Sequence, residues 1–115
     1  MAFQDWMKQA NLIGGDWVAA DSGETIDVTN PATGDVIGTV PKGGKAEAER
    51  AIKAAVAAFP GYRDTSLMDR CALLWKLHDA LMDNQKDLAE LLTVEMGKPL
   101  AESMGEIAIG AQYVR

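Results

Sequence analysis

The sequence has 115 residues, of which 48% are hydrophobic and 24% charged, a balance typical of a folded protein rather than a disordered segment. Lys and Arg number 11 against 17 Asp and Glu, and the net charge of −6 argues against nucleic-acid binding, which requires clustered positive charge. No apolar run approaches the roughly 18 residues of a membrane span. The first ten residues have no basic start followed by an apolar stretch, so we expect no signal peptide there. The single cysteine, Cys71, excludes an internal disulfide, so we expect a cytoplasmic protein.

The part of the chain before residue 45 is predicted to form two β-hairpins with tight turns. In the first hairpin, Gly14 and Gly15 permit the positive φ of a two-residue turn. In the second, Pro31 presets a turn dihedral and Gly34 suits a left-handed position before the return strand. The strands are short, so we expect them to need a partner surface. They are predicted at residues 12–13, 17–18, 25–28 and 36–40.

The rest of the chain is predicted to be helical because apolar residues recur every three or four positions. Pro60 and the glycine after it are predicted to end the first helix, and Ser66 begins a capping-box pattern before the second. Gly97 is predicted to close the third helix, and Pro99 fits the first turn of the fourth. The helices are predicted from Lys45 to Phe59, after Ser66, from Asn84 up to Gly97, and from Pro99 onward.

The last predicted helix has no stop signal before the sequence ends at Arg115. A natural domain usually closes its last helix with a cap. We therefore expect the chain to be a piece of a longer protein. The apolar stripe of this helix comprises Leu100, Met104, Ile107, Ala108, Ala111 and Val114.

Two residues with reactive side chains are predicted to be structural. Cys71 lies on the apolar stripe of the second helix between leucines, so we expect it in the core rather than as an accessible nucleophile. His78 lies two helical turns further on, too far for direct contact with Cys71 on one helix. We expect this partly buried histidine to be satisfied by a neighbour, and a lone histidine is not a metal signature.

The residues themselves show no catalytic constellation. Gly43-Gly44-Lys45 looks like the end of a phosphate loop, but Ala46 follows where a magnesium-binding Ser or Thr is needed, so we expect a flexible turn. No Gly-x-Gly-x-x-Gly dinucleotide fingerprint is present. Acidic pairs one helical turn apart are expected to be solvated surface rather than an acid–base dyad. These pairs are Asp79 with Asp83 and Glu102 with Glu106.

Two motifs stand in a fixed order along the chain: Asn-Pro-Ala-Thr-Gly at residues 30–34, and Glu-Met-Gly-Lys-Pro-Leu-Ala-Glu at residues 95–102. With the stretches at 13–18 and 51–59, they make the segment from residue 12 to 115 resemble the N-terminal part of the aldehyde dehydrogenase superfamily. Within the superfamily, the residues of these stretches resemble those of succinate-semialdehyde dehydrogenases most, while betaine-aldehyde and other semialdehyde enzymes share much of the same sequence.

The resemblance implies an α/β fragment. Residues 1–115 would be the N-terminal portion of a single Rossmann-like coenzyme-binding domain, built of hairpins and amphipathic helices, with the catalytic and oligomerisation domains outside this chain. It also implies oxidation of a small aldehyde to its carboxylic acid through a cysteine thiohemiacetal, with NAD or NADP, by a homo-oligomer of two or four chains. The nucleophile of the family stands in a Gly-Gln-x-Cys sequence, whereas Cys71 stands between Arg70 and Ala72, so no catalytic or cofactor-binding residue is transferred to this chain.

One site is carried over by the resemblance. Several relatives hold a monovalent cation on two backbone carbonyls, here those of Val28 and Thr29, and on an acidic side chain, here Glu95. Hard cations favour such oxygen ligands, although many relatives have Asp where this chain has Glu95. The alternative interpretation is an ordinary strand end beside a helix C-terminus.

Two functions follow from these observations. The first is the N-terminal part of an NAD(P)-dependent dehydrogenase of succinate semialdehyde, or of another semialdehyde or betaine aldehyde, inactive as the 115-residue piece alone. The second is a non-catalytic helical interaction module that shares only ancestry with the enzyme.

Overall fold

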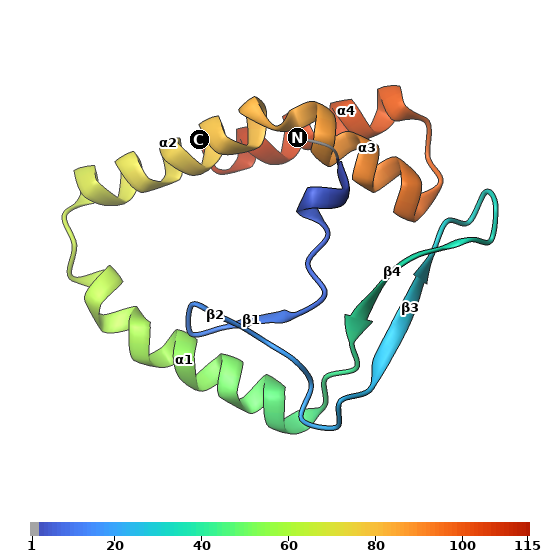
Figure 1. The fold of residues 1–115 in the computed structure, drawn as a ribbon. Helices are drawn as coiled ribbons and strands as arrows, with labels where there is room; N and C mark the ends of the chain where they lie inside the picture. The colour runs from blue at the N-terminus through green and yellow to red at the C-terminus, as the bar shows by residue number, and fades with distance from the viewer. Residues whose placement is uncertain (1–2) are drawn as a thin grey trace. The chain divides into compact units, whose positions relative to one another are not determined.

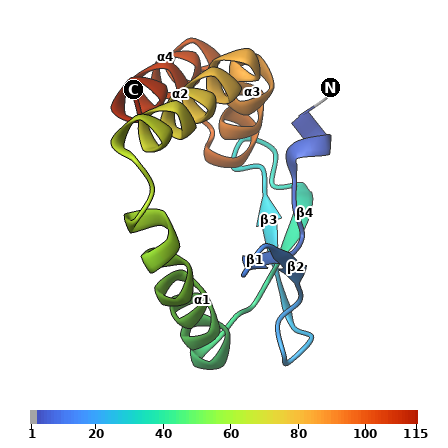
Figure 2. The ribbon, with the colours of Figure 1, turned by 90° about the vertical axis from the view of Figure 1, so that its left-hand side faces the viewer.

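The structure, a computed structural model, describes residues 3–115. These residues fall into two compact units, which we describe separately. The hairpin unit holds residues 8–29 and 36–64, and the helical unit holds the described residues up to Met7 together with residues 30–35 and 65–115. The elements of both are labelled in Figure 1 and seen from a second side in Figure 2.

The hairpin unit contains both predicted hairpins. Strand β1 (Asn11–Ile13) pairs antiparallel with β2 (Asp16–Val18), and β3 (Thr25–Thr29) pairs antiparallel with β4 (Val36–Pro41). The turn between β1 and β2 consists of two glycines with φ of +64° and +93°, values that glycine adopts without steric penalty. Gly34, in the turn between β3 and β4, has φ of +80°, so both hairpins confirm the predicted positions of the turn glycines.

Helix α1 (Lys45–Arg63) continues through Pro60, where the sequence predicts its end. That prediction is wrong because a proline near the last turn removes one backbone hydrogen bond but already has a helical φ. The helix stops one turn later, where the N–H of Asp64 donates to the carbonyl of Pro60 at 3.0 Å. An alanine face of α1 and the β1–β2 turn line one cleft. Its lining includes Ala51, Ala54, Ala55 and Ala58 with residues 12–15.

The helical unit packs α2 (Leu67–Asp83), α3 (Gln85–Met96) and α4 (Leu100–Tyr113) together, and Figure 2 shows these three helices side by side. The 3-10 helix η1 (Phe3–Trp6) contacts α3. Helix α4 ends at Tyr113, before the sequence does, whereas the apolar pattern predicts no end there. Within residues 3–115, no helix has the length and apolar character needed to cross a membrane.

The ends of these helices follow the predicted signals with two differences. The Ser66 hydroxyl accepts the N–H of Asp69 at 3.1 Å and caps α2 as predicted. Asn84 precedes α3, but its side-chain amide donates to the carbonyl of Ala80 at 2.8 Å, so it closes α2 instead of capping α3. Pro99 lies just before α4 rather than in its first turn, and its carbonyl accepts the N–H groups of Glu102 and Ser103.

Small residues form the most deeply buried part of the helical unit. Ala89, Ser103 and Ala111 have no exposed surface, and the Ser103 and Thr93 hydroxyls lie 2.8 Å apart between α3 and α4. The apolar periodicity identified Ala111 but not Ser103. Large apolar side chains of α2 stay exposed, Leu67 by 66%, so the described residues do not cover the predicted stripe.

Lys98 forms an ion pair in the helical unit whose two partners differ in exposure. Its side chain is only 12% exposed, and its Nζ donates to Glu106 Oε1, whose side chain is 53% exposed. Removing one partner of such a pair matters most when the buried charge is the one left behind.

We therefore expect Glu106→Gln to destabilise the folded protein by about 1–2 kcal/mol, because the ammonium keeps only a neutral acceptor. Lys98→Met keeps the apolar stem and leaves a hydrated carboxylate, so its effect is expected to stay within about 1 kcal/mol. Urea unfolding of the two variants measures the difference. Equal effects, or a larger effect of Lys98→Met, would contradict the asymmetry.

Candidate functional site

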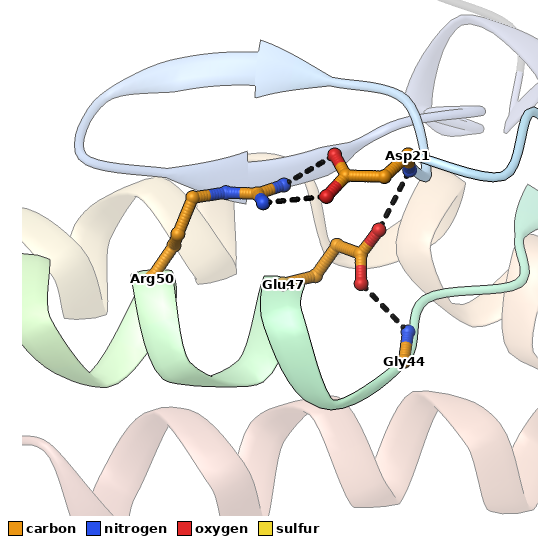
Figure 3. A network of polar contacts seen from close by, with 4 residues as sticks. All are labelled: Asp21, Gly44, Glu47 and Arg50. Carbon is orange, nitrogen blue, oxygen red and sulfur yellow. Dashed lines mark hydrogen bonds and ion pairs between the residues drawn. The ribbon is translucent and has the colours of Figure 1, made fainter.

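A network of polar contacts in the hairpin unit lies at the start of α1 (Figure 3). Glu47 accepts two backbone N–H groups, that of Asp21 on Oε1 at 2.6 Å and that of Gly44 on Oε2 at 2.9 Å. Arg50 donates to both carboxylate oxygens of Asp21, at 2.7 and 2.8 Å. We call Asp21, Gly44, Glu47 and Arg50 the Glu47 cluster.

The local sequence explains how the cluster forms. The first N–H groups of a helix have no partner within the helix, and a glutamate three residues after the N-cap can reach back to the N-cap N–H. Gly44 and Glu47 have this spacing. Asp21 comes from the connection between β2 and β3, 26 residues earlier in the chain, so the cluster also joins two distant segments.

Glu47 is 7% exposed and firmly anionic. The N–H groups of Asp21, of Gly44 and of Glu47 itself lower its pKa from 4.5 to about 2, and Arg50 adds a smaller attraction. A general base works best with a pKa near the operating pH, so this carboxylate is unsuited to proton transfer. It also occupies the helix N-terminus where a phosphate would bind, in agreement with the rejection of a phosphate loop at residues 43–45.

The sequence predicted a flexible turn before α1 and did not single out Glu47. Two signals were available: the spacing from Gly44 to Glu47, and a glycine pair directly before an apolar periodic run. The third partner, Asp21, has no such local signal.

The two reactive side chains of α2 have different outcomes. Cys71 is exposed, so its predicted place in the core is wrong for the described residues, which leave that face of α2 uncovered. His78 is satisfied by neighbours as predicted: its Nδ1 lies 3.0 Å from Asp79 Oδ1, and its ring meets Trp75 edge-on at 5.4 Å. Residues 3–115 hold no cluster of three or more metal-ligating His, Cys, Asp or Glu side chains.

The predicted cation ligands belong to different units. Val28 and Thr29 end β3 in the hairpin unit, and the β-ladder register is irregular between them. Glu95 lies in the last turn of α3 in the helical unit, exposed, and its carboxylate has no hydrogen bond or ion pair among the described residues. The site stays a prediction.

Comparison with known proteins gives the family to which this sequence is similar. The model of the aldehyde dehydrogenase family matches residues 17–115. The chain is 52% identical over 107 residues to a glutarate-semialdehyde dehydrogenase of Pseudomonas putida, and 47% identical over 107 residues to an NADP(+) succinate-semialdehyde dehydrogenase of Escherichia coli. Each alignment covers 93% of this chain and 22% of the relative, so the chain spans about a fifth of the length of these relatives.

A solved structure gives the same assignment in three dimensions. Succinate-semialdehyde dehydrogenase from Burkholderia pseudomallei superposes with a TM-score of 0.92 at 49% identity, over 95% of this chain and 23% of that one. The superposition confirms the α/β fragment that the two motifs imply. Since the family match extends over well more than half of the sequence, the chain belongs to the aldehyde dehydrogenase family.

Proposed function

We propose that the protein containing this chain is an NAD(P)-dependent dehydrogenase that oxidises a short semialdehyde, succinate semialdehyde first, to the dicarboxylic acid. The observation that carries the proposal is the 47–52% identity to dehydrogenases named for succinate and glutarate semialdehyde. Both names denote a short aldehyde with a carboxylate at the other end. Such a substrate offers a charge that a binding site can recognise.

This chain supplies scaffold rather than chemistry in the proposal. NAD or NADP would accept the hydride and would be bound by residues outside this chain. The thiolate that attacks the aldehyde would also belong to a residue outside this chain. The 115 residues would form the N-terminal portion of the coenzyme-binding domain, in a cytoplasmic homo-oligomer. The exposed Cys71 has no activating partner among the described residues and takes no part.

The test is a substrate panel on the full-length protein, with reduced nicotinamide measured by absorbance. We expect kcat/KM for succinate or glutarate semialdehyde to exceed that for butanal at least about tenfold. The reason is that the polar groups of a pocket that binds the carboxylate have no partner when the neutral aldehyde is bound. Each substrate is measured with NAD and with NADP.

The 115-residue chain alone serves as the matched control and is expected to show no turnover. A preference for betaine aldehyde would favour the other branch of the family. Absence of turnover with every aldehyde would contradict the proposal, and turnover by the 115-residue chain would place catalytic residues where we find none.

A further inference from the structure

The connection between β2 and β3, residues 19–24, is attached to the rest of the hairpin unit at a few points. Ala20 is 6% exposed, and its carbonyl accepts the N–H of Gly23 at 2.9 Å in a tight turn. Asp21 binds Glu47 and Arg50 of α1. Glu24 binds Lys42, which follows β4, through an ion pair of 3.1 Å and a backbone hydrogen bond of 2.9 Å.

These attachments differ in how well they are shielded from water. The Glu24 and Lys42 side chains are 62% and 59% exposed, and exposed ion pairs contribute little. The Asp21 and Arg50 side chains are also largely exposed. Among the charged side chains of these attachments Glu47 is the buried one, and a charged acceptor of two backbone N–H groups makes the strong kind of hydrogen bond. The attachment therefore depends chiefly on Glu47.

One side chain serves two segments here. Oε1 of Glu47 holds the connection through Asp21, and Oε2 holds the start of α1 through Gly44 (Figure 3). If the carboxylate leaves, both N–H groups lose their partner together. The flanking hairpins have two strands each, an arrangement of marginal stability by itself.

We propose that Glu47 acts as a latch, which makes the connection at residues 19–24 and the first turn of α1 open and close as one local unit. Opening exposes the free N–H groups at the start of α1 and widens the cleft of about 400 Å³ between the two segments, lined by Asp21, Ser22, Glu24 and residues 42–47. Local opening of this kind occurs well below the free energy of global unfolding.

Amide hydrogen exchange of the full-length protein tests the latch. In Glu47→Gln we expect the hydrogen-bonded amides of Asp21 and Gly23, and those of Gly44 and Ala48, to exchange roughly tenfold faster or more. The reason is that one backbone N–H then faces an amide donor instead of a carboxylate. The amides of α3 and α4 should keep their rates. Glu49→Gln is the matched control, since Glu49 is an exposed carboxylate two residues on.

Asp21→Asn is a milder second variant, because it weakens the pairing with Arg50 but keeps the backbone N–H that Glu47 binds. We expect a smaller acceleration that is shared by both segments, since they open together. The latch is wrong if Glu47→Gln leaves both segments within about twofold of wild type, accelerates one segment without the other, or accelerates the whole protein uniformly. Equal acceleration in Glu49→Gln would contradict it as well.

Discussion

Replacing Gly97 by alanine is expected to destabilise the folded protein by about 2–4 kcal/mol. Gly97 ends α3 with φ of +83°, a conformation that disfavours any residue with a Cβ. The added Cβ would also lie 2.8 Å from Cγ of Pro31 in the turn after β3, closer than van der Waals contact allows. Strain and overlap act together, and the proline ring cannot swing away as a flexible side chain would.

Two further variants separate these causes in urea unfolding. Gly105→Ala places a methyl group on α4 where no atom lies within 4 Å apart from its chain neighbours and the backbone of its own helix, and we expect a gain of about 0.5–1 kcal/mol. Pro31→Ala combined with Gly97→Ala removes the overlap and leaves the φ strain, so the double variant should lose less than the sum of the single effects. Additive effects would show that the contact with Pro31 is unimportant.

Acid is expected to remove the stabilisation that Glu47 provides. The pKa of Glu47 is about 2 in the folded chain against 4.5 for the ordinary carboxyl, so the unfolded chain binds a proton more tightly. The contribution is therefore complete above pH 4.5, decreases as pH falls below that value, and is lost as pH passes through about 2.

The measurement is the difference in Tm between wild type and Glu47→Gln as a function of pH. We expect this difference to be largest near neutral pH and to shrink progressively below pH 4.5. Glu49→Gln should show a small difference throughout. A difference between wild type and Glu47→Gln that is the same at neutral pH and at about pH 2.5 would contradict the role of the charge.

Local chemistry was predictable from the sequence, and long-range chemistry was not. The turns and caps at Gly14, Ser66 and Gly97 were predictable because each of these residues favours a backbone conformation or a hydrogen bond within a few residues. Pro60 failed as a stop signal because its fixed φ fits a helix, and α1 continues through it to Arg63. Cys71 failed as a core residue because periodicity shows which face is apolar, while burial requires a segment that covers it.

The candidate site illustrates the same division. The spacing of Gly44 and Glu47 contains half of the Glu47 cluster, but the bond to Asp21 joins residues 26 positions apart and leaves no periodic trace. Family membership was predictable because it rests on two motifs with fixed order. The substrate was not, because relatives that match this chain to a similar degree are named for different semialdehydes.

The contact between Pro31 and Gly97 also constrains how this sequence can evolve. The Asn-Pro and Gly-Lys-Pro motifs, which mark the family, lie against each other inside the helical unit. A residue larger than glycine at position 97 requires a smaller or displaced side chain at position 31, so the two positions cannot drift independently. In a chimera whose crossover falls between these positions, residue 31 comes from one parent and residue 97 from the other. The two side chains fit only when both parents have the same combination of residue sizes at these positions.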